Sequence, residues 1–303
     1  MEHHDHSLAQ DIQTMLDMSI SRRQSLRWLF AGAAGAATLP IVGCGGGDSA
    51  AGAAATTTPA TTPADTPATS TSGNATGSTG STSTSCAVIP EETGGPYPAD
   101  GSNNSVNGVA NALILAGIVR SDIRASVAGA TGVAAGVAAG IPLTIKLQMV
   151  NVNASCASLA GATVYLWHCD RDGLYSMYSS GVTGQNYLRG VQEADSSGLV
   201  TFTTIFPGCY DGRMPHVHFE VYQSLAKATN AANRIKTSQF GFPAAMLAQA
   251  YASAGYSKSV SNLARISYAT DNVFSDGTSL QIAATTGNAA QGYVATLTVG
   301  VSL

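Results

Sequence analysis

A series of short strand-like runs, separated by turns, constrains the fold of this 303-residue chain more than any other feature. Side chains of a strand alternate between two faces, and Leu143, Ile145 and Leu147 share one parity in this way. Turns rich in Gly, Asp and Asn separate the runs, which is typical of an all-β sandwich. The expected strands are residues 141–152, 162–167, 199–205, 217–222, 280–284 and 292–301.

Three local patterns add detail to this fold. Residues 195–198 read Asp-Ser-Ser-Gly and predict a hairpin-type turn before the strand at 199–205. Residues 242–255, which Gly255 ends, predict one short helix. Residues 292–301 alternate polar and apolar side chains, as an outer strand does. Long loops are expected to connect the remaining elements.

Residues 1–43 have the features of a targeting segment and are excluded from the fold. Arg22 and Arg23 form a twin-arginine pattern, and the apolar stretch that follows is short for a membrane span. This stretch ends at Cys44 in a box similar to that of bacterial lipoproteins. We therefore expect an exported protein of the cell envelope, periplasmic or on the outer surface, with a lipid on Cys44 as its only membrane contact. A soluble exported protein cleaved elsewhere is the alternative.

The composition separates a tether from a folded domain. Residues 44–85 consist almost entirely of Ala, Thr, Pro, Ser and Gly, which cannot bury enough apolar surface to offset the entropy of ordering. We interpret them as a flexible tether and residues 86–303 as the folded domain. Charged residues make up only 11% of the chain and its formal net charge is −4, which argues against a nucleic-acid partner.

Four cysteines lie within the expected domain: Cys86, Cys156, Cys169 and Cys209. An oxidising compartment permits disulfides, and four cysteines allow three pairings. A bridge between Cys169 and Cys209 would clamp the segment that holds the candidate site. Small buried thiols are an equally good interpretation of these two residues.

His216 and His218 are the first candidate functional residues. In a strand they leave the same face, while Val217 and Phe219 point to the opposite, core-facing side. Two neutral imidazoles on one face are a ready pair of metal ligands. A zinc hydrolase is a weaker interpretation of the pair, because no third His, Cys or carboxylate ligand stands at a usual spacing.

Two tyrosines stand at turns upstream of this pair. Tyr175 ends the turn at residues 172–175, and Tyr210 follows a Pro-Gly-Cys break in the chain. A hard ferric ion favours anionic oxygen, and a phenol binds a metal only after it loses its proton. Because the ordinary pKa of tyrosine is about 10, a nearby metal charge must favour that loss.

Three segments, in order, resemble the catalytic core of the intradiol ring-cleavage dioxygenases, which include catechol and protocatechuate dioxygenases. They read GATVYLWHCDRDGLYS, YLRGVQEADSSGLVTFTTIFPGCYDGR and PHVHFEV. The loop between the second tyrosine and the first histidine has only five residues, fewer than in cytoplasmic members. The resemblance implies the metal ligands Tyr175, Tyr210, His216 and His218, and the active-site residues Arg213 and Gln239.

This resemblance also implies a fold and an activity. The fold would be the transthyretin-like β-sandwich of the family, and the cofactor Fe(3+). The reaction would open a catechol-type ring between its adjacent hydroxyls with O2, giving a muconate-type diacid. Tyr210 would leave the metal and take up a proton, Arg213 would stabilise developing negative charge, and Gln239 would orient the substrate.

Two points stay open at this stage. Residues 93–97 resemble the N-terminal segment of the family domain, so Tyr97 either lines the substrate site or caps the edge of the core. The second function that the chain allows is non-catalytic: a surface-tethered sandwich that captures a catechol or a metal. The sequence assigns no oligomeric state.

Overall fold

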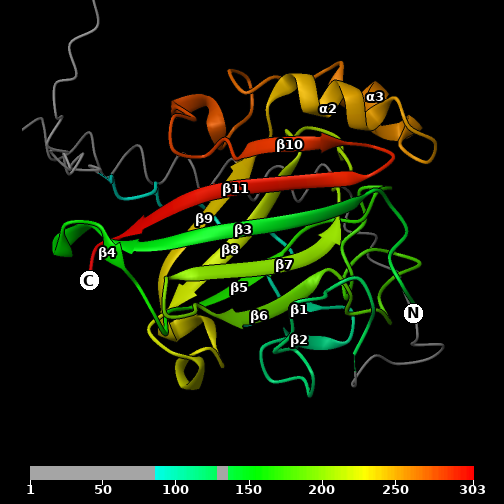
Figure 1. Cartoon of the computed structure of the whole chain (residues 1–303). Helices are drawn as coiled ribbons and strands as arrows, with labels where there is room; N and C mark the ends of the chain where they lie inside the picture. Colours follow the sequence, from blue (N-terminus) through cyan, green and yellow to red (C-terminus); the bar gives the residue numbers. More distant parts are fainter. Residues whose placement is uncertain (1–85, 128–135) are drawn as a thin grey trace, which may run out of the picture. The chain divides into compact units, whose positions relative to one another are not determined.

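The computed structural model describes residues 86–127 and 136–303, which form the strand-rich unit in Figure 1. The targeting segment, Cys44 and the tether lie outside the described residues, so those interpretations stay predictions. The strands are β1 Asp100–Ser105, β2 Gly108–Asn111, β3 Pro142–Asn151, β4 Ala157–Ser158, β5 Thr163–Trp167, β6 Arg189–Glu193, β7 Leu199–Ile205, β8 His216–Tyr222, β9 Arg234–Gly241, β10 Ala284–Asn288 and β11 Gly292–Val301.

These strands form two main sheets and a hairpin, as the all-β prediction requires. One sheet is antiparallel with the order β6-β5-β8-β9. The other has the order β10-β11-β3-β4, and β7 also pairs with β3. Its β11–β3 pair is parallel. The hairpin of β1 and β2 lies near residues 229–233, where Asn111 Nδ2 donates to the Thr229 carbonyl oxygen.

The main core fills the space between the two sheets. Leu143 and Phe202 contribute from one sheet, and Val164, Val217 and Phe219 contribute from the other, all buried. The predicted inward orientation of Val217 and Phe219 is therefore confirmed. The side chains of β5 and β8 that point away from this core face a second cluster. That cluster covers the outer face of the four-stranded sheet.

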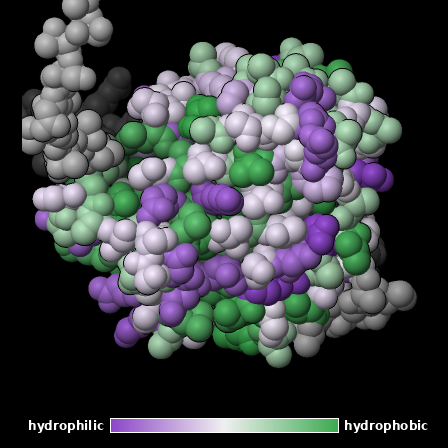
Figure 2. Space-filling model, viewed as in Figure 1, coloured by the Kyte–Doolittle hydropathy of each residue, from purple (hydrophilic) through white to green (hydrophobic). Residues whose placement is uncertain are grey.

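That second cluster is where the candidate site lies. Tyr165 and Trp167 of β5 pack there with Tyr175, under the chain that leads into the β1–β2 hairpin. On the molecular face in Figure 2, hydrophilic and apolar residues are interspersed. The largest aromatic side chains, including Trp167 and Tyr165, are buried instead.

Three strand predictions are wrong in detail. The turn at 195–198 forms, but β6 and β7 belong to different sheets, so it is a crossover between sheets and no hairpin. The strand expected at 280–284 begins only at Ala284, because residues 281–283 bond to Gly241 at the end of β9. Strand β11 is internal, because β10 pairs with its outer side.

The helix expected at 242–255 forms over a shorter range as α2 Ala244–Tyr251, near β10 in Figure 1. A second helix, α3 Ser257–Leu263, was not expected. The first helix ends at Tyr251, with Ala252 as its C-cap, so Gly255 is not its stop. Gly255 lies in the turn that follows, with a left-handed φ of +92° that suits glycine. The chain then starts a second helix two residues later. Neither helix, nor any other in the described part of the chain, has the length and apolar character needed to span a bilayer.

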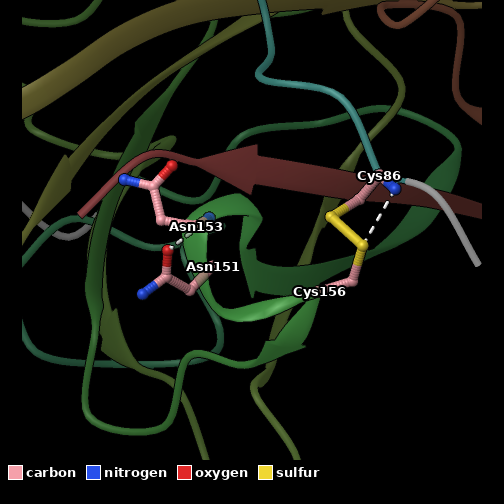
Figure 3. Close-up of a disulfide and its surroundings, with 4 residues drawn as sticks. All are labelled: Cys86, Asn151, Asn153 and Cys156. Atoms are coloured by element: carbon pink, nitrogen blue, oxygen red, sulfur yellow. Dashed lines mark hydrogen bonds between the residues drawn. A yellow bond between two sulfur atoms is a disulfide. The ribbon is translucent and has the colours of Figure 1, made fainter.

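A disulfide joins Cys86 to Cys156, 70 residues further along the chain (Figure 3). Cys156 follows a short turn in which the Asn153 amide donates to Asn151 Oδ1. The bond ties the first described residue to the loop between β3 and β4.

The possible bridge between Cys169 and Cys209 is not formed, and both residues are buried thiols. Cys169 Sγ lies 3.5 Å from the Gly208 carbonyl oxygen, and Cys209 Sγ lies 3.4 Å from the Arg213 carbonyl oxygen. Burial raises the pKa of Cys209 to about 12, so its thiol stays protonated at neutral pH. The alternative interpretation, small buried thiols, is the correct one.

His168 connects the two sheets and makes stability depend on pH. Its Nδ1 lies 2.7 Å from the Cys169 carbonyl oxygen, and its Nε2 lies 2.7 Å from Thr204 Oγ1 in β7. Burial lowers the pKa of His168 from 6.5 to about 4. Between these values the folded state binds fewer protons than the unfolded state, so stability is lost as the pH falls.

We expect this histidine to remove up to about 3 kcal/mol of the free energy of unfolding between pH 6.5 and pH 4. Urea denaturation at pH 7 and at pH 4 measures the loss. His168→Gln, which does not titrate, should show a loss smaller by that amount. Equal losses in the two proteins would contradict the assignment.

Candidate metal centre

Two histidines of β8 form the centre of the site. His216 and His218 are each 2% exposed, and their Nε2 atoms are 2.9 Å apart. His216 Nδ1 lies 2.6 Å from the Met214 carbonyl oxygen, which can only accept a hydrogen bond. Nδ1 therefore carries the proton and Nε2 carries the lone pair. A metal ion between the rings would be bound by both Nε2 atoms.

The ring of His218 is held by stacking. Trp167 of β5 is the direct cross-strand partner of His218, and the two rings are 4.9 Å apart and nearly parallel, at 3°. Residues directly opposite in an antiparallel pair share one face of the sheet. The strand register thus decides both where His218 lies and how its ring is turned.

The two tyrosines reach the histidines from separate loops. Tyr175 lies in the loop between β5 and β6, and its Oη is 3.5 Å from His216 Nε2. Tyr210 lies in the loop between β7 and β8, with its ring centroid 5.7 Å from that of His216. The two tyrosine rings meet edge to face, with centroids 5.8 Å apart. The structure therefore brings all four predicted ligands together.

A glycine lets the two tyrosine loops approach each other. Gly173 has a φ of +83°, and a Cβ at this position would lie 3.0 Å from Tyr210 Cβ. Asp170 shapes the same turn, because its Oδ1 accepts hydrogen bonds from the amides of Asp172 and Leu174. These acidic residues therefore act as turn residues, which is the usual role of Asp after a strand.

Burial keeps the four candidate ligands uncharged without a metal. It raises the pKa of Tyr175 far above its ordinary value and that of Tyr210 to about 12. It lowers the pKa of His216 to about 3 and that of His218 well below its ordinary range. Two phenols and two neutral imidazoles fit a hard trivalent cation, whose charge favours loss of the phenol protons.

Arg213 and Gln239 lie next to the four ligands. Gln239 of β9 is the direct cross-strand partner of His218, and its Oε1 accepts a hydrogen bond of 2.8 Å from Arg213 Nη2. Gln239 Nε2 donates to the Thr93 carbonyl oxygen at 2.7 Å. Both ends of the Gln239 amide are therefore engaged within the protein. Arg213 Nη1 is buried, with no hydrogen-bond partner among the described residues.

Asp271 is a site residue that the sequence analysis missed. This fully buried carboxylate accepts from Arg213 Nε at 2.9 Å and from the Met214 amide at 2.7 Å. It thereby holds the arginine and the peptide that leads into His216. The surroundings of Asp271 in the sequence, Thr-Asp-Asn-Val, show only a turn. Its role depends on a contact 58 residues away along the chain.

Tyr97 lies beside the site and also packs, partly buried, against the second cluster. Its ring centroid is 4.8 Å from that of Tyr175 and 5.3 Å from that of Tyr178. No group of three or more His, Cys, Asp or Glu residues that could hold a metal occurs in residues 86–127 and 136–303. The zinc-hydrolase interpretation therefore has no third ligand of its usual kind in this part of the chain.

The features to compare with known proteins are two packed sheets and a site of two tyrosines, two histidines and an arginine. A family model described as Dioxygenase matches residues 124–234. An intradiol ring-cleavage dioxygenase from Tetranychus urticae is 25% identical, with a TM-score of 0.53, over 72% of this chain and 95% of that chain. The chain is thus similar to the intradiol ring-cleavage dioxygenases, in sequence over residues 124–234 and in fold over 72% of its length.

Two further solved structures are similar to this chain. A second dioxygenase is 24% identical, with a TM-score of 0.53, over 72% of this chain and 95% of that chain. The 3-chlorocatechol 1,2-dioxygenase from Rhodococcus opacus 1CP is 14% identical, with a TM-score of 0.41, over 71% of this chain and 72% of that chain. The first of these shares the fold of this chain.

Proposed function

We propose that this protein is a non-haem Fe(III)-dependent intradiol dioxygenase. It cleaves a catechol-type ring between adjacent hydroxyls with O2 and forms a muconate-type diacid. The observation that carries the proposal is the convergence of Tyr175, Tyr210, His216 and His218 from two loops and one strand. These four residues would hold the iron. Bound iron would act as a Lewis acid and as a template for the diol oxygens.

The two tyrosines differ in their access to solvent. Tyr175 is 1% exposed, whereas Tyr210 is only partly buried. A residue that exchanges a proton during turnover needs room to move and a route for the proton. Tyr210 is therefore the tyrosine that takes up a proton from the diol, and Tyr175 keeps its place throughout.

Arg213 supplies positive charge to the reacting ring. Its Nε and Nη2 are engaged by Asp271 and Gln239, which leaves the buried Nη1 free of protein partners among the described residues. A pre-oriented buried donor stabilises negative charge that develops in the transition state, because no reorganisation is needed at that moment. Gln239 then acts through Arg213, as its amide is engaged at both ends.

Purified protein tests this proposal directly. Protein prepared with iron available should contain about one iron per chain and absorb visible light through tyrosinate bound to Fe(III). Oxygen consumption with a panel of diols, including catechol and hydroxyquinol, should follow. Coloured protein that consumes no oxygen with any diol would instead support a non-catalytic binding module. Colourless, metal-free protein would contradict the dioxygenase function and the capture of a metal.

Tyr210→Phe tests the role of the partly exposed tyrosine. The change removes one oxygen donor and the proton acceptor, while the ring keeps its packing against Tyr175 and His216. We expect a displaced visible band and a turnover rate that is lower by about 10²- to 10⁴-fold, the usual range for loss of a positioned proton acceptor. Absorption spectra and oxygen uptake measure both effects.

The matched control is Tyr293→Phe, which removes a buried tyrosine hydroxyl in the other sheet, bonded to Gln249. This variant should keep the colour and the turnover rate of the unchanged protein. If Tyr210→Phe also keeps the original spectrum, Tyr210 is no ligand.

We also propose that the protein is exported and attached to the envelope through a lipid on Cys44. Support comes from the twin-arginine pattern, the lipoprotein-type box and the Cys86–Cys156 disulfide, a bond that persists mainly in oxidising compartments. The mass of the mature N-terminal peptide, measured on membrane-fraction protein, tests this proposal. A peptide that begins elsewhere and carries no lipid would contradict it.

A further inference from the structure

Arg189 is a buried arginine for which the proposed function gives no role so far. It is 1% exposed and begins β6, where its direct cross-strand partner is Trp167. Trp167 in turn pairs with His218, and His218 pairs with Gln239. Arg189 therefore belongs to the same row across the sheet as the candidate histidine ligand, and direct cross-strand partners share a face.

The guanidinium of Arg189 uses all five of its N–H donors. Nε donates to Ser176 Oγ at 3.1 Å, and Nη1 donates to the Pro98 carbonyl oxygen at 3.0 Å and to Tyr165 Oη at 3.1 Å. Nη2 donates to the carbonyl oxygens of Tyr97 and Ser176, both at 2.9 Å. Since an arginine has five N–H donors, this set is complete.

The partners of Arg189 are neutral, and most are backbone carbonyls. No ion pair within residues 86–127 and 136–303 includes this arginine. Its positive charge is therefore held by oriented dipoles and by the face of Tyr178, whose ring centroid is 5.5 Å from the guanidinium carbon. Such an arrangement requires several chain segments to turn their carbonyls toward one point.

The backbone around Arg189 is strained in a way that fits this requirement. Five non-glycine residues in the described part of the chain have left-handed φ values. Two of them adjoin partners of Arg189, and a third adjoins Arg189 itself. Ala99 (φ 50°) follows Pro98, Met177 (φ 72°) follows Ser176, and Leu188 (φ 56°) precedes Arg189. Residues with a Cβ seldom adopt this conformation, and it persists only where the surroundings impose it.

Two of the three segments that Arg189 joins carry an aromatic residue of the site. One segment presents Tyr97, and the other presents Tyr175, the residue before Ser176. Their rings are 4.8 Å apart. A second link runs parallel to the first: the Ala99 amide donates to Tyr178 Oη at 2.8 Å, and Tyr178 Oη donates to Asn103 Oδ1.

We propose that Arg189 is a positioning residue, which fixes the position of Tyr175 and holds Tyr97 in contact with it. The proposal rests on the proposed function, in which Tyr175 is a metal ligand. Arg189 acts through the carbonyls of the two segments and does not touch the ligand atoms. An arginine is needed because its rigid fork reaches three segments at once, which the single ammonium group of lysine cannot do.

The experiment compares Arg189→Gln with Arg120→Gln. Arg120 also donates to backbone carbonyl oxygens, those of Arg189, Asn186 and Ala125, but to no residue of the two positioned segments. Hydrogen exchange in the metal-free proteins reports on the segments through the amides of Ala99, Tyr175 and Ser179, each of which donates a hydrogen bond. Visible spectra and oxygen uptake are then measured on the iron-loaded proteins.

Arg189→Gln is expected to speed exchange of these three amides at least tenfold and to displace the visible band. It should also lower kcat/KM by about 10- to 100-fold, since small displacements of positioned groups have effects of this size. Arg120→Gln should leave the three amides and the visible band unchanged. Unchanged exchange and an unchanged band in folded Arg189→Gln would overturn the proposal.

The outcomes separate this proposal from the proposed function. If the unchanged protein binds no iron, the proposed function fails, and the proposed positioning of a metal ligand fails with it. If the unchanged protein is coloured and active and Arg189→Gln matches it, only the role of Arg189 is wrong. If Arg189→Gln does not fold, Arg189→Lys carries the test with the same expected direction. If neither variant folds while Arg120→Gln does, Arg189 is needed for folding of the whole domain. That result would overturn the proposal.

Discussion

His218→Ala is expected to give folded protein that contains no iron and has no visible colour. The change removes an imidazole whose Nε2 lies 2.9 Å from His216 Nε2. Only three of the four converging donor residues then remain to bind the metal. Replacing a residue that only supports a metal ligand usually lowers metal affinity by about 10- to 100-fold. Loss of a ligand itself should exceed about 100-fold. Metal analysis and absorption spectra measure the effect.

The matched control for this change is His168→Gln. His168 is also buried, but its two ring nitrogens face the Cys169 carbonyl and Thr204 Oγ1 and are not directed at the site. This variant should keep its iron and its colour. Circular dichroism of both variants checks that the fold is present. His218→Ala protein that retains stoichiometric iron would contradict the ligand assignment.

Replacing Cys86 and Cys156 together by serine is expected to lower the free energy of unfolding by about 4 kcal/mol. The bond closes a loop between residues 70 apart in sequence, and such a closure restricts the unfolded chain. It also holds the segment that forms an isolated bridge from Val88 to Gly300 in β11. Urea denaturation with and without a reducing agent measures the change.

Reducing agent supplies the control for this prediction. It should bring the unchanged protein to the stability of the double variant and leave the double variant itself unaffected. Cys169 and Cys209 are free thiols in the structure, so neither should respond in this assay. Equal denaturation midpoints for the unchanged and doubly substituted proteins in the absence of reductant would show that this bond does not stabilise the domain.

Much of the fold could be predicted because strand patterns are local. The expected strands at 199–205 and 292–301 match β7 and β11 at both ends, and the run at 141–152 matches β3 within one residue. The runs that became β6 and β9 were missed. Both lie in the four-stranded sheet and depend on partners far away in the sequence.

The errors in the fold share one cause. Residues 281–283 carry strand-like side chains but bond to Gly241, which leaves β10 to begin at Ala284. The alternating pattern of β11 arises because one of its faces is less buried than the other. The pattern does not indicate which strands pair with β11 on its two edges. Pairing partners are chosen by long-range packing, and a local pattern does not contain that information.

The sequence by itself determined which residue types stand at the site. The two histidines alternate within one strand, so their shared face follows from strand geometry alone, and the spacing of the two tyrosines and Arg213 follows a family pattern. Only the tertiary structure decided the support around them. Asp271 meets Arg213 across 58 residues, and Arg189 meets Pro98 across 91 residues. Such contacts depend on how strands and loops pack in space, because a buried charge takes its partners from whichever segments the fold brings near it.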